Sequence, residues 1–243
     1  MEDFFMSKFK RLDATLAVMI ISTLLLASFM VSIWFKSFVG DINAMASMGE
    51  KIIIIDPGHG GEDAGAIGKG EIYEKDLNLE YALEIGKILS EKGYTVVYTR
   101  TEDKMLYSPE ENIKGHRKIS DLKNRLAVCD GYPNSILVSV HMNSFGASKY
   151  SGLQVYYKRD SEDSRRLASS IQESVRSGVQ PDNKRQIKDG GDLYLLDNSS
   201  VPAVIIECGF MSNEEEMTKL LQKEYKNRLS FSIVCGIIEY IEK

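Results

Sequence analysis

The hydrophobic positions of this 243-residue chain follow two different patterns. From Ala14 to Phe35 the chain runs for about 22 residues without a charged side chain. From Lys51 onward, short apolar runs such as 52–55 and 136–138 alternate with stretches in which apolar residues recur every three or four positions. This alternation predicts strands separated by crossover helices. The sequence therefore predicts an α/β fold with a twisted, largely parallel (mixed) sheet and helices on both faces.

The individual elements follow from the same pattern. Leu77, Tyr81, Ile85 and Leu89 lie on one face of a helix that begins near Glu74. Further helices are predicted at 119–128, at 161–178 and over much of the last thirty residues. The predicted strands are 51–56, 94–99, 135–141, 153–158, 193–196 and 203–207. Polar or glycine-rich segments at 58–70, 101–118 and 181–192 are predicted to be loops.

The uncharged run at 14–35 is long enough to cross a hydrocarbon core of about 30 Å. Three positive residues (Lys8, Lys10 and Arg11) precede it and only Lys36 closely follows, which places the N-terminus in the cytoplasm. We therefore expect a cytoplasmic segment (1–13), a transmembrane signal anchor (14–35), a tether (36–50) and an extracytoplasmic domain (51–243). The small residues at 44–46 also allow cleavage by signal peptidase. Either way, residues 51–243 are exported.

The charge balance bears on possible partners. The net charge is −5 and the isoelectric point is near 5.4, which argues against nucleic acid as a partner. The three cysteines (129, 208 and 235) are widely spaced and form no C-x-x-C pattern. They are predicted to be buried free thiols. The exported part is thus predicted to be one domain without a disulfide framework.

Three of the apolar runs end in side chains that can bind a metal or carry a proton. His59 follows the run at 52–55, His141 ends the run at 136–140, and Glu207 ends the run at 204–206. In open α/β sheets, ligands bind beyond the carboxyl ends of the strands. The pattern therefore predicts a site at this edge of the sheet.

A hydrolytic zinc site uses three protein ligands and leaves a fourth position for water. His59 and His141 are two candidate ligands, and Glu74, at the start of a predicted helix, is the favoured third. Glu62 and Asp63 lie nearer to His59 in sequence and are competing choices. The prediction is one zinc ion (Zn2+) per chain, whereas His116 is expected to lie on the surface.

Glu207 has two possible roles. A carboxylate directly after three apolar residues is costly to bury unless it is paired, metal-bound or protonated. It can be a fourth metal ligand or the general base that takes a proton from water. Because a fourth protein ligand would close the site, an open hydrolytic site favours the base.

Four sequence segments resemble motifs of the zinc-dependent N-acetylmuramoyl-L-alanine amidases of the amidase-3 family. They are residues 56–61 (DPGHGG), Glu74 with Asn78, residues 139–143 (SVHMN) and residues 207–213 (ECGFMSN). The resemblance covers essentially all of 51–243. It implies hydrolysis of the amide that joins N-acetylmuramic acid to the L-alanine of peptidoglycan. It also implies zinc held by His59, Glu74 and His141, Glu207 as catalytic residue, and framework roles for Thr99, Arg100 and Arg125.

A membrane-anchored, single-domain amidase is similar to the sporulation and germination enzymes of endospore-forming bacteria, which help to form muramic-δ-lactam in cortex peptidoglycan. This similarity implies peptidoglycan as substrate and an envelope protein as a possible activator or targeting partner. Two alternatives are a zinc peptidase that cleaves within the stem peptide and an inactive peptidoglycan-binding domain. The complete set of four candidate site residues weighs against the inactive domain.

Overall fold

The computed structural model describes residues 16, 18–33, 51–113 and 115–243. The chain divides between residues 50 and 51 into two units. In the first unit, residues 16 and 18–33 are helical. No helix among the described residues has the length and apolar character needed to cross a membrane. The predicted span at 14–35 extends at both ends beyond the described residues, and the predicted segments 1–13 and 36–50 lie outside them.

The second unit is built on a mixed sheet. Its six strands are β1 (Ile52–Pro57), β4 (Val96–Tyr98), β5 (Ser135–Asn143), β6 (Gln154–Tyr157), β7 (Lys188–Asp189) and β8 (Ala203–Phe210). They lie in the order β4-β1-β5-β8-β6-β7. The first four run parallel, β6 runs antiparallel to β8, and β7 is parallel to β6. The prediction of a largely parallel, mixed sheet is confirmed.

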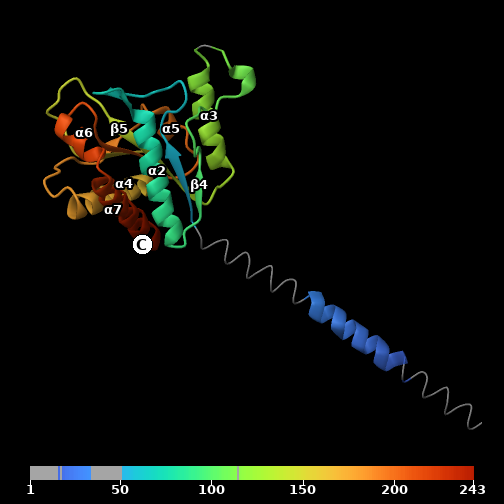
Figure 1. Ribbon diagram of the computed structural model, residues 1–243. Coiled ribbons are helices and arrows are strands. Elements are labelled where there is room, and N and C mark those ends of the chain that lie inside the picture. The colour runs from blue at the N-terminus through green and yellow to red at the C-terminus, as the bar shows by residue number, and fades with distance from the viewer. Residues whose placement is uncertain (1–15, 17, 34–50, 114) are drawn as a thin grey trace, which may run out of the picture. The chain divides into compact units, whose positions relative to one another are not determined.

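Helices cover both faces of this sheet (Figure 1). They are α2 (Glu74–Glu91), α3 (Arg117–Asp130), α4 (Glu162–Gly178), α5 (Tyr194–Asp197), α6 (Glu214–Leu220) and α7 (Lys223–Glu242). Ile53 and Ile55 face the core shared with α2, α4 and α7, whereas Ile54 faces the core shared with α3 and α5. This alternation follows the two-residue period of a strand that is buried on both faces.

Local sequence explains where several helices begin. Ser161 caps α4 by accepting a hydrogen bond from Ser164 N, and Asn213 caps α6 by accepting from the N–H groups of residues 215 and 216. Helix α2 begins with Glu74 and Asp76 in its first turn, where the helix dipole favours negative charge. Helices α2, α3 and α4 each begin within two residues of the start that the apolar periodicity predicted.

The structure differs from the prediction in the least periodic segments. Residues 193–196, predicted as a strand, form most of the short helix α5, because a four-residue apolar run cannot distinguish a strand from a buried helical turn. Strand β7 lies inside the predicted loop 181–192 and completes the sheet instead. The glycine-rich segment also contains a small hairpin of β2 (Ile67–Gly68) and β3 (Ile72–Tyr73).

The cysteines are free, as predicted, but they are not all buried. Cys129 and Cys208 lie in the two cores, whereas Cys235 is exposed on α7. The expectation of a buried thiol at position 235 is therefore wrong. Helix α7 turns this residue away from the core that its neighbours Ile233, Val234 and Ile237 join.

Candidate metal centre

The sheet brings the predicted site residues to one edge. Strands β1, β5 and β8 are parallel neighbours, so their carboxyl ends lie together. His141 in β5 is the register partner of Glu207 in β8, and His59 follows the end of β1 by two residues. Glu74 joins them from the first position of α2. Three strands and one helix thus assemble these four side chains at the predicted edge.

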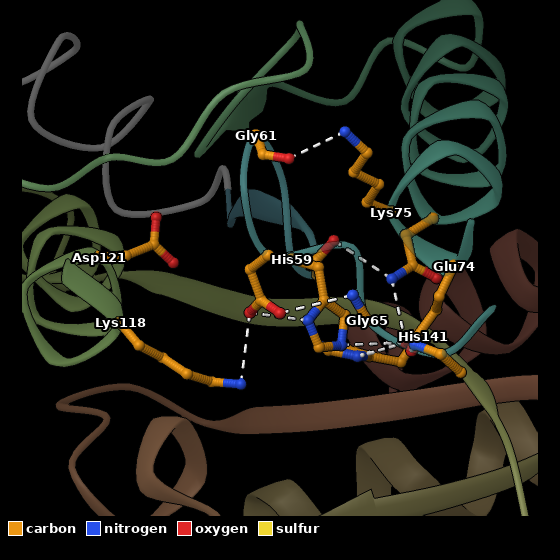
Figure 2. A network of polar contacts seen from close by, with 12 residues as sticks. His59, Gly61, Gly65, Glu74, Lys75, Lys118, Asp121 and His141 are labelled. Atoms are coloured by element: carbon orange, nitrogen blue, oxygen red, sulfur yellow. Dashed lines mark hydrogen bonds and ion pairs between the residues drawn. The ribbon is translucent and has the colours of Figure 1, made fainter. Parts of the chain in front are cut away.

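Three of these residues form a cluster that could hold a metal ion. His59, Glu74 and His141 each offer one potential ligand atom, and these three atoms lie within 4.8 Å of one another. Glu74 Oε1 is 3.2 Å from His59 Nε2 and 3.0 Å from His141 Nδ1. Figure 2 shows both imidazole rings converging on the Glu74 carboxylate. Two imidazole nitrogens and one carboxylate oxygen are typical of catalytic zinc sites.

The Glu74 carboxylate is held in place by hydrogen bonds as well as by the histidines. Oε2 accepts from Ala66 N at 2.8 Å, and Oε1 accepts from Met142 N and from Asn78 Nδ2, both at 3.2 Å. Asn78 lies one helical turn after Glu74 and also donates to Gly58 O. The side chain is buried, so these contacts fix its direction.

The backbone of the loop after β1 allows this close packing. A Cβ atom on Gly58 would lie 2.2 Å from the ring of His141, and one on Gly65 would lie 2.5 Å from Glu74 Oε2. Gly65 also has φ +67°, which glycine adopts without strain. His59 has φ 59° although it carries a side chain, so its backbone is held in a conformation that is rare for residues other than glycine.

The two competing carboxylates lie beside this cluster. Asp63 Oδ2 is 2.9 Å from His59 Nδ1, without the alignment of a hydrogen bond, and 3.3 Å from Lys118 Nζ. Figure 2 shows Lys118 approaching this contact from α3. Glu62 pairs with Arg117 at the surface. Asp63 therefore contacts the outer nitrogen of His59, whereas Glu74 contacts the inner one.

The electrostatics of the cluster favour a positive charge. Burial lowers the pKa of His59, but its pairing with Asp63 and Glu74 outweighs burial and raises that pKa to about 9. Burial raises the pKa of Glu74, but both histidines outweigh it and hold that pKa well below its usual range. The carboxylates therefore stabilise a cation between them, whether a proton or a metal ion.

Glu207 lies in the same row of side chains but outside the three-residue group. The residue is half-buried, yet its Oε2 atom is inaccessible and has no hydrogen-bond partner among the described residues. Burial raises the pKa of Glu207 to about 7, helped by the negative charge of Glu74 and opposed by His141 and His59. A carboxyl group with this pKa can both accept and return a proton near neutral pH.

Two buried arginines hold the loop that carries His59. Arg125 donates to the carbonyl oxygens of Pro57 and His59 and pairs with Asp56 at 2.6 Å. Arg100 donates to the carbonyl oxygens of Pro57 and Gly58. Both side chains are 2 % exposed. This arrangement agrees with the framework roles that the family resemblance implies for these arginines.

Asp56 is a site residue whose role the sequence did not reveal. Its carboxylate accepts hydrogen bonds from Thr99 Oγ1 and Ser139 Oγ, both at 2.6 Å, in addition to the contact with Arg125. Asp56 thereby links the end of β1 to the middle of β5, to the residue after β4 and to α3. Two signals marked the position but not its contacts: a charged residue at the end of a four-isoleucine run, and its place as the first residue of the motif at 56–61.

The polar segment at 101–118 packs against the same loop. Asp103 accepts from Gly61 N at 2.6 Å and from Lys75 Nζ at 2.6 Å. Leu106 N donates to Asp121 Oδ1 in α3. Helix α3 begins at Arg117, two residues earlier than predicted, and His116 is exposed as expected. The described part of this segment thus supports the outer wall of the site.

Comparisons with known proteins agree with this geometry. Residues 53–239 match the family model described as N-acetylmuramoyl-L-alanine amidase. The germination-specific N-acetylmuramoyl-L-alanine amidase of Bacillus subtilis (strain 168) is 36% identical over 192 residues, which cover 78% of this chain and 79% of that protein.

Two solved structures extend the comparison. The CwlD amidase of Clostridioides difficile, solved in complex with the GerS lipoprotein, superposes with a TM-score of 0.76 at 38% identity, over 79% of this chain and 99% of that one. An N-acetylmuramoyl-L-alanine amidase of Clostridium difficile 630 gives a TM-score of 0.70 at 30% identity, over 80% and 98% of the two chains. This chain belongs to the N-acetylmuramoyl-L-alanine amidase family, and it is an amide hydrolase of that class.

Proposed function

We propose that this amidase acts on cortex peptidoglycan during spore formation, so that the spore can later germinate. The bond cleaved joins the lactyl group of N-acetylmuramic acid to the L-alanine of the stem peptide, and the cleavage leads to muramic-δ-lactam. The observation that carries the proposal is the convergence of His59, Glu74 and His141 beside Glu207. The similarity to a germination-specific amidase supports the biological setting.

The residues present fit one zinc ion per chain. Two imidazole nitrogens and a carboxylate oxygen face a common point, and the surrounding carboxylates favour a cation there. His59, Glu74 and His141 would hold the ion. Zinc would supply a Lewis acid that lowers the pKa of water and polarises the scissile carbonyl group.

Glu207 is the proton carrier in this proposal. Its carboxylate can accept a proton from a water molecule and release it to the leaving nitrogen of L-alanine. Burial keeps the pKa of this group near neutrality, so neither transfer is strongly uphill. Asp63 contacts the outer nitrogen of His59 and would keep the inner nitrogen directed at the metal.

The test is the product released from purified cortex peptidoglycan by the full-length chain in detergent. The expected products are muramic acid with a free lactyl carboxyl group and a peptide with a free L-alanine amine, both identified by mass spectrometry. Cleavage between two amino acids would instead identify a stem-peptide peptidase. Binding without cleavage by zinc-loaded protein would identify an inactive binding domain.

We infer that the chain is anchored in the cell membrane with residues 51–243 outside the cytoplasm. The uncharged run at 14–35 and the positive charges before it support this orientation. The full-length chain should stay with membranes after a carbonate wash and should be digested by external protease. Release of a chain that begins after residue 46 would instead establish a cleaved signal.

We further propose a lipoprotein partner in the cell envelope, since a related amidase was solved in complex with a lipoprotein. Such a partner would place or activate the enzyme. Full activity of the isolated chain on purified sacculi, unchanged by envelope extract, would argue against a required partner.

A further inference from the structure

Arg185 is a half-buried arginine that makes no ion pair with any described residue, although its charge acts through space on the buried carboxylate of Glu216. Its Nε donates to Ser151 O at 2.7 Å, and its Nη1 donates to Gln154 Oε1 at 3.2 Å. Its guanidinium lies over the ring of Phe210, 4.4 Å from the centroid. Within the described part of the chain, no carboxylate lies at ion-pair distance from this guanidinium, and Nη2 donates no hydrogen bond.

Of the other buried or half-buried arginines in the described part of the chain, Arg100 makes no ion pair but donates four hydrogen bonds to backbone carbonyl oxygens, and the remaining three are paired with carboxylates. Arg125 contacts Asp56, Arg176 contacts Glu173, and Arg117 contacts Glu62. Arg185 is held by two hydrogen bonds and by stacking on Phe210, but its Nη2 group donates no hydrogen bond within the described part of the chain. A fixed, unpaired guanidinium is a receptor for a planar anion such as a carboxylate.

The free side of Arg185 borders a cavity of about 620 Å³. This volume lies in the range of cavities that bind small ligands. Lysines 149, 184 and 219 and two carboxylates, Asp182 and Glu215, lie on its rim. The buried Glu216 in its wall already accepts hydrogen bonds from Gly152 N at 2.6 Å and Phe210 N at 2.8 Å. The three lysines balance the three carboxylates of the lining, so Arg185 alone gives the cavity one excess positive charge.

The sheet places this cavity next to the candidate metal centre. His141 pairs with Glu207, and Glu207 pairs with Gln154, so these three residues form one row across β5, β8 and β6. The two strand spacings from His141 to Gln154 span about 10 Å. Arg185 bonds the side chain of Gln154 and so continues the row into the cavity.

We propose that Arg185 binds the free α-carboxylate of the second stem residue, a D-glutamate that is linked onward through its side-chain carboxyl group. An extended peptide advances about 3.5 Å per residue, so this carboxylate lies about 7 Å from the scissile amide. With a hydrogen bond of about 2.8 Å the reach is about 10 Å, which matches the separation between His141 and Gln154 in the row that Arg185 continues. The assignment rests on the proposed amidase function and names a specificity determinant of the same site.

The experiment compares two synthetic muramyl-tripeptides that differ only at this group, which is a carboxylate in one and a carboxamide in the other. Wild-type enzyme should cleave the carboxylate form with a kcat/KM about tenfold higher or more, as expected for one charge-assisted contact. Arg185→Gln should lose that advantage, mainly through a higher KM, and should leave cleavage of the carboxamide within about twofold. Arg185→Lys should retain part of the preference, because it keeps the charge but loses the fork.

The matched control is Arg165→Gln, which removes an exposed arginine charge on α4. It should leave both substrates unchanged. Zinc content and thermal unfolding are measured for every variant. Equal losses on both substrates by Arg185→Gln would assign the arginine a purely structural role and overturn the proposal. Equal cleavage of both substrates by wild-type enzyme would also overturn it but leave the amidase function intact, whereas cleavage of neither by zinc-loaded wild-type enzyme would contradict the amidase function itself.

Discussion

Glu207 shows how strongly the surroundings of one residue set its chemistry. The apolar residues before it in β8 belong to the core, yet the carboxylate that follows them within the strand has an oxygen without a partner among the described residues. Burial raises the pKa of Glu207 to about 7. The same burial that makes the group costly for folding thus makes it suitable for moving a proton.

Glu207→Gln tests this role directly. The variant should fold, keep its zinc and lose turnover by about 10²- to 10⁴-fold, because glutamine has a similar shape but cannot accept the proton. Turnover of muropeptides and metal content are measured together. His141→Ala serves as the comparison and should lose the metal. Loss of zinc from Glu207→Gln would make Glu207 a ligand and our assignment wrong.

Gly58 is constrained by the ring that lies against it. In Gly58→Ala the new methyl group would lie 2.2 Å from His141, so the ring must move. We expect zinc affinity to fall by about 10- to 100-fold, the range found when the support of a metal ligand is lost. Titration with a competing chelator measures this change. Gly146→Ala, where the added Cβ has open space, is the control and should bind zinc normally.

At the scale of elements, the end of β1 is the point where the site is fastened to the fold. Burial alone would raise the pKa of Asp56, but the charge of Arg125 and the hydrogen bonds from Ser139 and Thr99 outweigh it and lower that pKa. Because the lowered pKa belongs to the folded state, the ionised carboxylate stabilises the fold.

The sign of this effect predicts acid sensitivity. The contribution of Asp56 is fully present above its unfolded pKa, close to 3.8, and is lost as the pH falls through the lower folded value. Unfolding by denaturant between about pH 6 and pH 2 should show this loss, and Asp56→Asn should be less sensitive to acid over the range. At pH 7 the same variant should cost about 3–5 kcal/mol, since it breaks a buried ion pair. An unchanged acid dependence would contradict this role.

Periodicity predicted the elements that carry the site but not their side-chain partners. The long helices and the strands that end near His59, His141 and Glu207 have clear apolar patterns, and they were found where expected. The run at 193–196 is too short to have a period, and its helical turn is decided by packing in the core beside α3. The contact between Asp63 and His59 depends on the loop conformation, which no spacing rule specifies.

At the scale of the molecule, the metal centre joins parts that are distant in sequence. Its candidate ligands come from the loop after β1, from α2 and from β5. An ion bound by all three favours the folded state over the unfolded chain. Stability and metal binding should therefore be measured as one linked equilibrium.

Removal of zinc should lower the thermal unfolding temperature. At a free metal concentration about 100-fold above the dissociation constant, binding contributes about 2.7 kcal/mol. For a domain of this size, that corresponds to a shift of about 5–10 °C. Calorimetry with and without a chelator measures the shift, and His141→Ala should show none. Equal shifts in both proteins would mean that the chelator acts elsewhere.

The left-handed backbone of His59 sets stability against function at a single position. Glycine adopts φ near 59° without strain, so His59→Gly relieves the backbone but gives up the imidazole contacts with Asp63 and Glu74. Comparing His59→Gly with His59→Ala in metal-free protein isolates the backbone part, and the glycine variant should unfold at the higher temperature of the two. Neither variant retains both imidazole ligands. Laboratory evolution of this amidase for heat resistance alone would act on the strain and the contacts at position 59 without regard to cleavage, so any such campaign must screen for peptidoglycan cleavage at every round.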